Sequence, residues 1–204
     1  MTFPFSRSTN AEDGSEAKAG SSRAFFWELL QVVAISLAIV VPIRYFVAAP
    51  FYVKGASMEP NFYDHEYLII DEMGYRFHAP ARGDIVVFRY PRDPSQFFIK
   101  RVIGLPNETV EITDNHVRIY NNASPNGQLL DESAYLESSV PTVGNKRVTL
   151  KPDEYFLLGD NRMASRDSRD FGAVKESAFV GRVWFRGLPP ERWTVFHTPS
   201  YPKP

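Results

Sequence analysis

The distribution of apolar residues divides the chain into three parts. Residues 1–23 are rich in Ser, Gly, Ala and charged residues and show no apolar periodicity, which predicts a flexible tail. Residues 24–49 are almost continuously apolar. At ~1.5 Å per residue, a helix of this length can cross a hydrocarbon core of ~30 Å. We therefore expect a transmembrane anchor helix over 24–49 and a separate domain over 50–204.

Beyond the apolar segment the pattern changes to short runs typical of β-strands. The expected strands are 67–70, 85–90, 97–103, 109–113, 116–120, 147–150, 155–158 and 179–186. Asp114-Asn115 is a two-residue hairpin signal, whereas Pro91 and Pro94 are expected to end the strand before them. Residues 121–146 are rich in Asn, Ser, Pro and Gly and are expected to form an excursion from the core. The predicted fold class is mainly β.

The apolar segment could instead be a cleaved signal peptide. Val47-Ala48-Ala49 has the small residues of a cleavage site, but Pro50 follows it and would obstruct attack on that bond. The tail before the segment is also long and acidic for a signal peptide. We expect the segment to persist as an anchor, with an orientation that the balanced flanking charges do not specify.

The composition of the chain excludes several classes of function. The net charge of −1 gives no electrostatic case for nucleic-acid binding. The chain has no cysteine, which excludes disulfides, thiolate catalysis and cysteine-ligated metals. Its four histidines are scattered without metal-ligand spacing. We expect neither a metal nor a cofactor.

A serine and a lysine in the β-rich part are candidate catalytic residues. Ser57 lies in the turn sequence Gly55-Ala56-Ser57-Met58-Glu59-Pro60 and needs a base to act as a nucleophile. Lys100 lies in an apolar run and would share a strand face with Phe98 and Val102. Burial there would lower its pKa from ~10.4 toward the ~7–8 that suits a general base, a change of roughly 4 kcal/mol. Neither residue is diagnostic alone, because turn serines and snorkelling lysines are common.

The charged stretch 159–169 could support such a pair. A serine hydroxyl from it could hold the lysine amine toward the nucleophile, and Asp167 and Arg169 could pair and fix the shape of the loop. Composition alone favours a solvated surface loop, in which such a pair contributes little.

Taken in order, these stretches resemble the bacterial type I signal peptidases. After the N-terminal apolar segment, the matching stretches are Gly55–Pro60, Arg82–Phe88, Ile99–Pro106 and Gly159–Arg169. The resemblance implies a Ser/Lys endopeptidase on coiled antiparallel β-sheets, with Ser57 as nucleophile and Lys100 as general base. It implies that Ser165 orients the lysine.

The resemblance also implies a supporting shell. Asp160, Asp167 and Arg169 match the family's charged residues around the site. The oxyanion would be held by the Ser57 backbone N–H. Some relatives supply a serine hydroxyl two residues earlier, where this chain has Gly55. The second donor is therefore left open.

Substrate and location follow from the same resemblance. It implies cleavage of preprotein signal peptides after Ala-x-Ala sites, with Val53, Met58, Phe62 and Ile99 as expected pocket walls. The substrate would add as a strand beside the Ser57–Lys100 pair. The implied setting is the bacterial cytoplasmic membrane, with one span, the tail 1–23 in the cytoplasm and the catalytic domain outside. We expect a monomer that contacts the bilayer, and the export machinery is a further possible partner.

Three other functions stay open. A self-cleaving Ser/Lys repressor-type peptidase would carry a DNA-binding helix-turn-helix, where this chain has a tail and an apolar segment. A Ser-His-Asp hydrolase would use Ser57 with Asp64 and His65, which are close together in sequence and lack a Gly-x-Ser-x-Gly elbow. A non-catalytic membrane-anchored module would tolerate replacement of Ser57 and Lys100.

Overall fold

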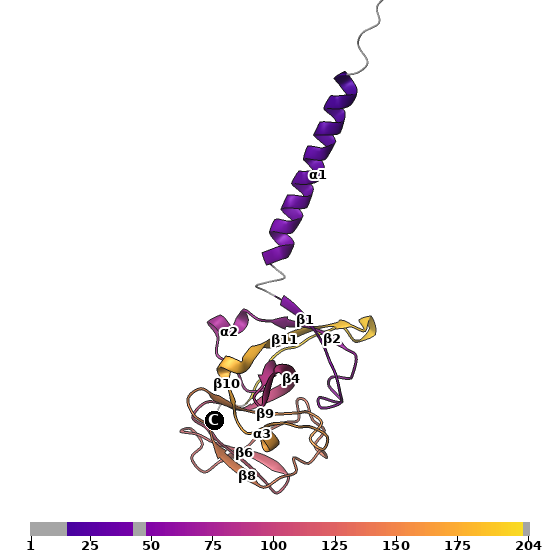
Figure 1. Cartoon of the computed structure of the whole chain (residues 1–204). Coiled ribbons are helices and arrows are strands. Elements are labelled where there is room, and N and C mark those ends of the chain that lie inside the picture. Colours follow the sequence, from indigo (N-terminus) through magenta and orange to yellow (C-terminus); the bar gives the residue numbers. More distant parts are fainter. Residues whose placement is uncertain (1–15, 43–47, 202–204) are drawn as a thin grey trace, which may run out of the picture. The chain divides into compact units, whose positions relative to one another are not determined.

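The computed structural model describes residues 16–42 and 48–201, which fall into two compact units (Figure 1). One unit ends at Arg44 and contains the long helix α1 (Glu16–Pro42). The other begins at Tyr45 and contains all the described strands. Each unit is described by itself.

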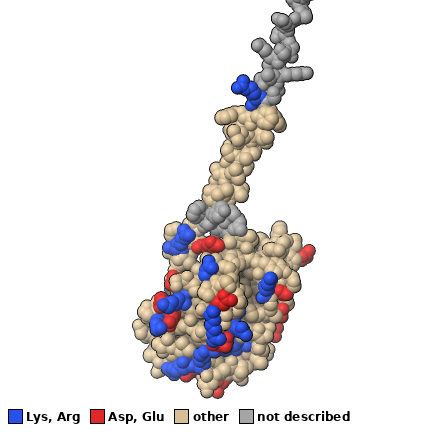
Figure 2. Space-filling model, in the orientation of Figure 1, with Lys and Arg blue, Asp and Glu red and all other residues tan. Residues whose placement is uncertain are grey.

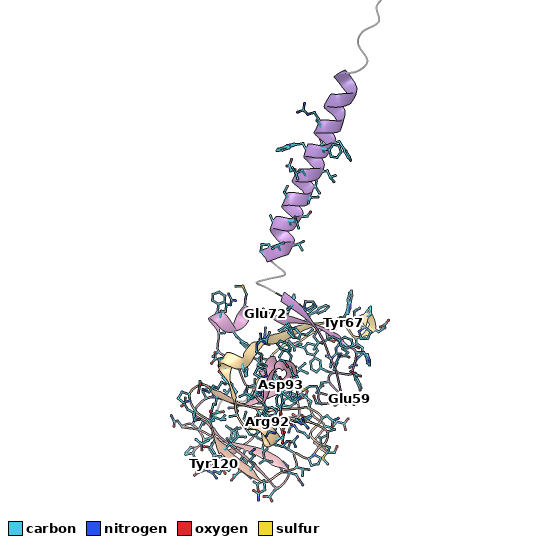
Figure 3. The ribbon with its side chains drawn as sticks, viewed as in Figure 1. Glu59, Tyr67, Glu72, Arg92, Asp93 and Tyr120 are labelled. Atoms are coloured by element: carbon cyan, nitrogen blue, oxygen red, sulfur yellow. The ribbon has the colours of Figure 1, made fainter. Side chains whose placement is uncertain are left out.

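Helix α1 is mainly apolar from Ala24 onward. From Arg23 to Pro42 it has a mean hydropathy of 2.2, and every described side chain is exposed to solvent within its unit. By length and composition this stretch can cross a bilayer. Figure 3 shows its side chains projecting in several directions, and Figure 2 shows few charged side chains along its visible face.

The stretch of the helix that could span a membrane begins at Arg23, beside the expected start of the anchor, but the helix itself begins earlier and the expected anchor extends too far at its C-terminal end. The helix begins at Glu16, inside the expected tail, because Glu, Ala and Lys after this point are strong helix formers. It ends at Pro42, and the expected anchor residues Ala48 and Ala49 lie instead in a strand that pairs with its neighbour. The rest of the expected tail, residues 1–15, lies outside the described residues.

The larger sheet is antiparallel and has the strand order β1-β2-β11-β3-β4-β9-β10, with β12 beside β11. Its strands are β1 (Ala48–Tyr52), β2 (Tyr67–Asp71), β3 (Ile85–Tyr90), β4 (Asp93–Gly104), β9 (Glu154–Leu158), β10 (Val174–Lys175), β11 (Phe179–Leu188) and β12 (Thr194–Val195). Short helical turns interrupt it: α2 (Gly74–Phe77), α3 (Ser168–Phe171), η2 (Glu176–Ala178) and η3 (Pro190–Arg192). The mainly β prediction is confirmed.

Strand β4 starts earlier than the prolines predict. Only Pro91 and Arg92 separate it from β3, and Tyr90 pairs with Asp93. Pro94 falls in the irregular stretch before the Arg89–Phe97 pair, where the missing N–H breaks no regular ladder. The long β4 then continues from this hairpin through Lys100 to Gly104.

The smaller sheet has the order β7-β6-β5-β8. Its strands are β5 (Thr109–Thr113), β6 (His116–Tyr120), β7 (Gln128–Leu129) and β8 (Lys146–Thr149). The hairpin between β5 and β6 turns at Asp114 and Asn115, whose φ values of 50° and 64° fit the expected two-residue turn.

The stretch 121–146 is less of an excursion than its composition predicts. It contributes β7 to the smaller sheet. Tyr135 and Leu136 are buried in the core of this sheet together with Ile112, Val117 and Phe156. Polar composition hid these contacts, because two buried side chains among many Asn, Ser and Pro residues produce no periodic pattern.

Candidate active site

Ser57 lies in the turn between β1 and β2 and is half-buried. Gly55 begins the turn with a φ of +87°, a conformation that L side chains rarely adopt, and its N–H donates to the Asp64 carboxylate at 2.9 Å. This explains why glycine occupies the position two residues before the candidate nucleophile.

Lys100 reaches Ser57 from the middle of β4. Its Nζ lies 2.8 Å from Ser57 Oγ and 2.8 Å from the Ile99 carbonyl oxygen. Only 3% of Lys100 is exposed, and its Nζ lies 5.4 Å from the centre of the Phe98 ring. The predicted shared face with Phe98 and Val102 is therefore formed.

Burial makes Lys100 an unusually weak base. It lowers the pKa of the amine from 10.5 to about 8, because removal from water disfavours the charged form. The carboxylates of Asp167 and Asp160 oppose this effect. A lysine with this pKa is partly neutral near neutral pH, which a general base requires.

Asp167 and Arg169 form the expected ion pair. Two nitrogens of the Arg169 guanidinium donate to the fully buried Asp167 carboxylate at 2.9 and 2.8 Å. The same carboxylate caps α3 and accepts the Gly159 N–H at 3.1 Å. The pair therefore closes the loop 159–169 on itself, and burial makes it worth more than a surface pair.

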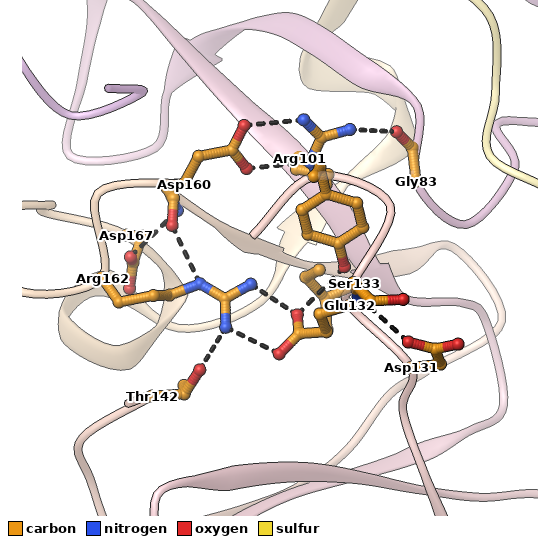
Figure 4. A network of polar contacts seen from close by, with 12 residues as sticks. Gly83, Arg101, Asp131, Glu132, Ser133, Thr142, Asp160, Arg162 and Asp167 are labelled. Atoms are coloured by element: carbon orange, nitrogen blue, oxygen red, sulfur yellow. Dashed lines mark hydrogen bonds and ion pairs between the residues drawn. The ribbon is translucent and has the colours of Figure 1, made fainter. Parts of the chain in front are cut away.

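Asp160 has partners that the sequence did not reveal. Arg101 donates to both of its carboxylate oxygens at 2.8 and 2.6 Å, and Asn61 Nδ2 donates at 2.9 Å. Figure 4 shows the Arg101–Asp160 pair, in which both side chains are buried. Because Arg101 follows Lys100 on β4, the Arg101–Asp160 pair connects the strand that carries Lys100 to the loop 159–169. The position of Arg101 beside Lys100 was the signal that could have found it.

Gly159 and Asn161 connect the loop to the Ser57 turn. The Asn161 N–H donates to the Ser57 carbonyl at 3.1 Å, and Asn161 Nδ2 donates to the Ala56 carbonyl at 3.0 Å. A Cβ added at Gly159 would lie 2.5 Å from the Ser57 carbonyl oxygen and 2.1 Å from Ser165 Oγ. Only glycine permits this close approach of three chain segments.

Ser165 does not form the expected hydrogen bond to Lys100. The described hydrogen-bond partners of the Lys100 amine are Ser57 and the Ile99 carbonyl, and the buried Ser165 Oγ has no hydrogen-bond partner among the described residues. The role of Ser165 in orienting the lysine therefore stays a prediction.

We expect Ser165→Ala to lower kcat without lowering stability. Within the described part of the chain the buried hydroxyl makes no hydrogen bond, so its removal leaves no orphaned partner there. If the hydroxyl assists the amine during reaction, kcat falls while the melting temperature stays within a few degrees of wild type. Cleavage rates and thermal unfolding of both proteins check this, and an unchanged kcat would leave Ser165 without a catalytic role.

The Ser57–Lys100 pair opens on a groove of about 680 Å³. Val53 and Ile99 line it, as the sequence predicts, together with Phe51, Leu68 and Val87. The groove also contains the edge of β4 from Gln96 to Ile99. Within the described chain, β9 pairs with β4 only from Arg101 to Gly104 and leaves that edge open.

Met58 and Phe62 do not line this groove in the described structure. Both are almost completely buried in a core cluster that also contains Leu68 and Ile70. Apolar residues near a nucleophile look alike in sequence whether they face a pocket or the core behind it. The prediction that these two residues form pocket walls is therefore corrected: they belong to the core on which the Ser57 turn packs.

The alternative base His65 is directed elsewhere. Its Nδ1 lies 3.1 Å from Asp64, and its side chain is 73% exposed. No described hydrogen bond joins it to Ser57, whose hydroxyl contacts Lys100 instead. The geometry therefore favours the Ser/Lys interpretation over a Ser-His-Asp site.

Together, the fold and this site define a mainly β protein in which a buried, weakly basic lysine contacts a serine hydroxyl at the side of an apolar groove. Residues 26–188 match the family described as signal peptidase, peptidase S26. The match covers well over half of the sequence, so the chain belongs to this peptidase family. The resemblance seen in the sequence is confirmed.

Several named relatives are similar over most of their length. The chain is 35% identical to the probable signal peptidase I-1 of Synechocystis sp. over 176 residues, which are 83% of this chain and 86% of that protein. It is 36% identical to the signal peptidase I of Leptolyngbya laminosa, covering 87% of this chain and 86% of the relative. A crystal structure of a signal peptidase I from Enterococcus faecalis V583 is 34% identical, with a TM-score of 0.43 over 52% of this chain and 97% of that one.

Proposed function

We propose that the protein is a membrane-bound endopeptidase that removes signal peptides from exported preproteins, with Ser57 as nucleophile and Lys100 as general base. The observation that carries the proposal is the 2.8 Å contact between Lys100 Nζ and Ser57 Oγ, made by a lysine whose pKa burial lowers to about 8. The names of the relatives, all signal peptidases, support the substrate class.

The reaction needs the neutral form of Lys100. Its amine takes the proton of the Ser57 hydroxyl as Oγ attacks the scissile carbonyl, and later returns a proton to the leaving amine. The resulting acyl-enzyme is then hydrolysed by water, with the same amine as base. The Ser57 backbone N–H donates to no backbone acceptor among the described residues, so it is available to the oxyanion. Gly55 has no side chain to supply a second donor.

The groove supports selection of a small-residue substrate. Its walls at Val53 and Ile99 are apolar and lie beside Ser57. The open edge of β4 offers main-chain groups to an extended peptide, so that backbone hydrogen bonds give affinity and the shallow walls reject large side chains. Specificity for Ala-x-Ala sites is part of the proposal.

Helix α1 supports anchoring in the membrane. Its exposed apolar stretch from Arg23 to Pro42 is long enough for a single span. We propose a single-pass protein of the bacterial cytoplasmic membrane that acts as a monomer on the extracytoplasmic side. Contact with the export machinery would bring preproteins to it.

The test is cleavage of a preprotein with an Ala-x-Ala junction by the full chain in detergent or lipid, followed by N-terminal sequencing of the product. We expect a cut after the second alanine and none when both alanines are replaced by leucine, because each leucine adds bulk that a shallow wall cannot accept. No cut by the folded full chain would refute the peptidase proposal and favour a binding module.

A further inference from the structure

The part of the chain expected to be an excursion contacts the active-site loop directly. Figure 4 shows Glu132 beside Arg162, and the Arg101–Asp160 pair in the same network. We propose that Tyr135 and Glu132 are positioning residues for the Ser57–Lys100 pair, an inference that rests on the function proposed for that pair. They hold Asp160 and Gly159 in place from the segment that connects β7 to β8.

Tyr135 contacts both side chains that donate to Asp160. Its ring stacks on Arg101, whose guanidinium carbon lies 4.0 Å from the ring centre. Its carbonyl oxygen accepts from Asn61 Nδ2 at 2.8 Å. Its hydroxyl donates to Glu132 at 3.0 Å. Since Tyr135 is only 9% exposed, these contacts fix it among buried groups and leave few other arrangements for Asp160.

Glu132 performs the corresponding task for Gly159. It accepts from Arg162 Nη1 at 2.9 Å, and the side chain of Arg162 is fully buried. Arg162 Nε in turn donates to the Gly159 carbonyl at 3.0 Å. A buried guanidinium needs an anionic partner to remain in place. Glu132 therefore keeps Arg162 on the Gly159 carbonyl.

The two contacts converge on the nucleophile. Gly159 packs against the Ser57 carbonyl with no room for a side chain, and Asn161 donates to the same carbonyl. A displacement of this loop therefore moves Ser57 relative to Lys100. Reacting groups misplaced by ~1 Å can cost about 100-fold in rate. Residues far from the peptide bond can thus control kcat without touching substrate.

The experiment compares Tyr135→Leu with Tyr135→Phe in the full chain. We expect Tyr135→Leu to lower kcat by about tenfold to a hundredfold with KM nearly unchanged, because the groove keeps its walls. Tyr135→Phe keeps the stacked ring and the carbonyl contact, so it should retain most of kcat. Tyr120→Leu is the matched control. Its ring also covers an arginine, Arg147, at 4.3 Å, but that arginine pairs with Glu111 on the smaller sheet.

A pH profile separates positioning from loss of stability. Burial is the main cause that lowers the pKa of Lys100. A loosened loop that admits water should therefore raise this pKa, and the increase of kcat/KM with pH should occur at higher pH than in the wild type. A merely structural role would lower the melting temperature and leave the profile in place. We expect the profile to move in Tyr135→Leu and to stay unchanged in Tyr120→Leu.

A second variant keeps the inference testable if Tyr135→Leu does not fold. Glu132→Gln preserves the shape of the side chain but removes the charge that faces Arg162. It should lower kcat by about threefold to tenfold and shift the pH profile of kcat/KM to higher pH, as in Tyr135→Leu. Wild-type kcat and pH profile in the folded variants would overturn the positioning role, as would an equal loss in Tyr120→Leu. Equal cleavage by wild type and Ser57→Ala would instead overturn the proposed function itself, and this inference with it.

Discussion

Ser57→Ala is expected to abolish cleavage, lowering kcat by at least about a thousandfold, while the fold stays intact. The hydroxyl contacts Lys100 and is half-buried at the edge of the groove, so its removal creates no core cavity. The turn around it depends on Gly55 and on the Asn161 N–H bond to the Ser57 carbonyl, which the substitution preserves. Product formation from an Ala-x-Ala preprotein measures the loss.

A suitable control is Ser124→Ala in the connection between β6 and β7. Its hydroxyl makes a long contact of 3.4 Å to Gln128, far along the chain from the site. This variant should cut like wild type. If Ser57→Ala retained a rate within tenfold of wild type while folding normally, another nucleophile would have to be found.

Lys100→Met is expected to abolish cleavage and, unusually for a buried position, to stabilise the protein. The thioether side chain fills similar volume and cannot accept a proton. Lowering the lysine pKa from 10.5 to about 8 corresponds to a cost of about 3 kcal/mol for burying the charged form. Loss of the hydrogen bonds to Ser57 and Ile99 offsets part of this. We expect a net gain of about 1–2 kcal/mol in unfolding free energy at pH 7.

That gain should depend on pH in a defined way. Below pH 8 the lysine of the wild type is protonated in both the folded and the unfolded chain, so the full cost applies. Between pH 8 and 10.5 folding releases a proton, and wild-type stability rises with pH. The advantage of Lys100→Met should therefore be largest below pH 8, vanish about one pH unit above it and be reversed at pH 10.5. Over the same range the wild-type kcat/KM should rise with an apparent pKa of about 8.

Denaturant unfolding in detergent at pH 6 and pH 10 checks the stability, and Lys100→Arg provides the comparison. Arginine stays charged at both pH values, so it should be inactive without any stability gain. A constant difference between Lys100→Met and wild type across this range would show that the lysine titrates with an ordinary pKa.

The contact of Ser57 with Lys100 was expected from the family resemblance, and the strands β1, β7, β10 and β12 were not predicted. The sequence alone was sufficient to predict the other strands and the hairpin at Asp114-Asn115. Local patterns carry these features, because strand periodicity and turn residues act over a few positions. The site's supporting shell was predicted only in part. Asp167 and Arg169 are near neighbours in sequence, and their pair could be foreseen.

The partners of Asp160 could not be foreseen in the same way. Asn61 and Arg101 come from a turn and a strand distant in sequence, and Tyr135 comes from a stretch whose composition resembles a loop. Apart from the position of Arg101 beside Lys100, a single sequence contains no signal for contacts between such segments. Met58 shows the related difficulty, since position beside Ser57 does not reveal which side of the turn it faces.

One edge of strand β4 changes from unpaired to paired at Lys100, the proposed general base. Residues up to Ile99 present an open edge, and from Arg101 onward the partner is β9, which ends opposite Arg101 at Leu158 and continues into Gly159. On the proposed function, a peptide laid along the open edge meets the end of β9 at this level. The end of β9 then limits how far the peptide can extend along β4. Because this end lies beside Ser57, the residue at which a bound peptide is cut depends on the register of its pairing with β4 as well as on the size of its side chains.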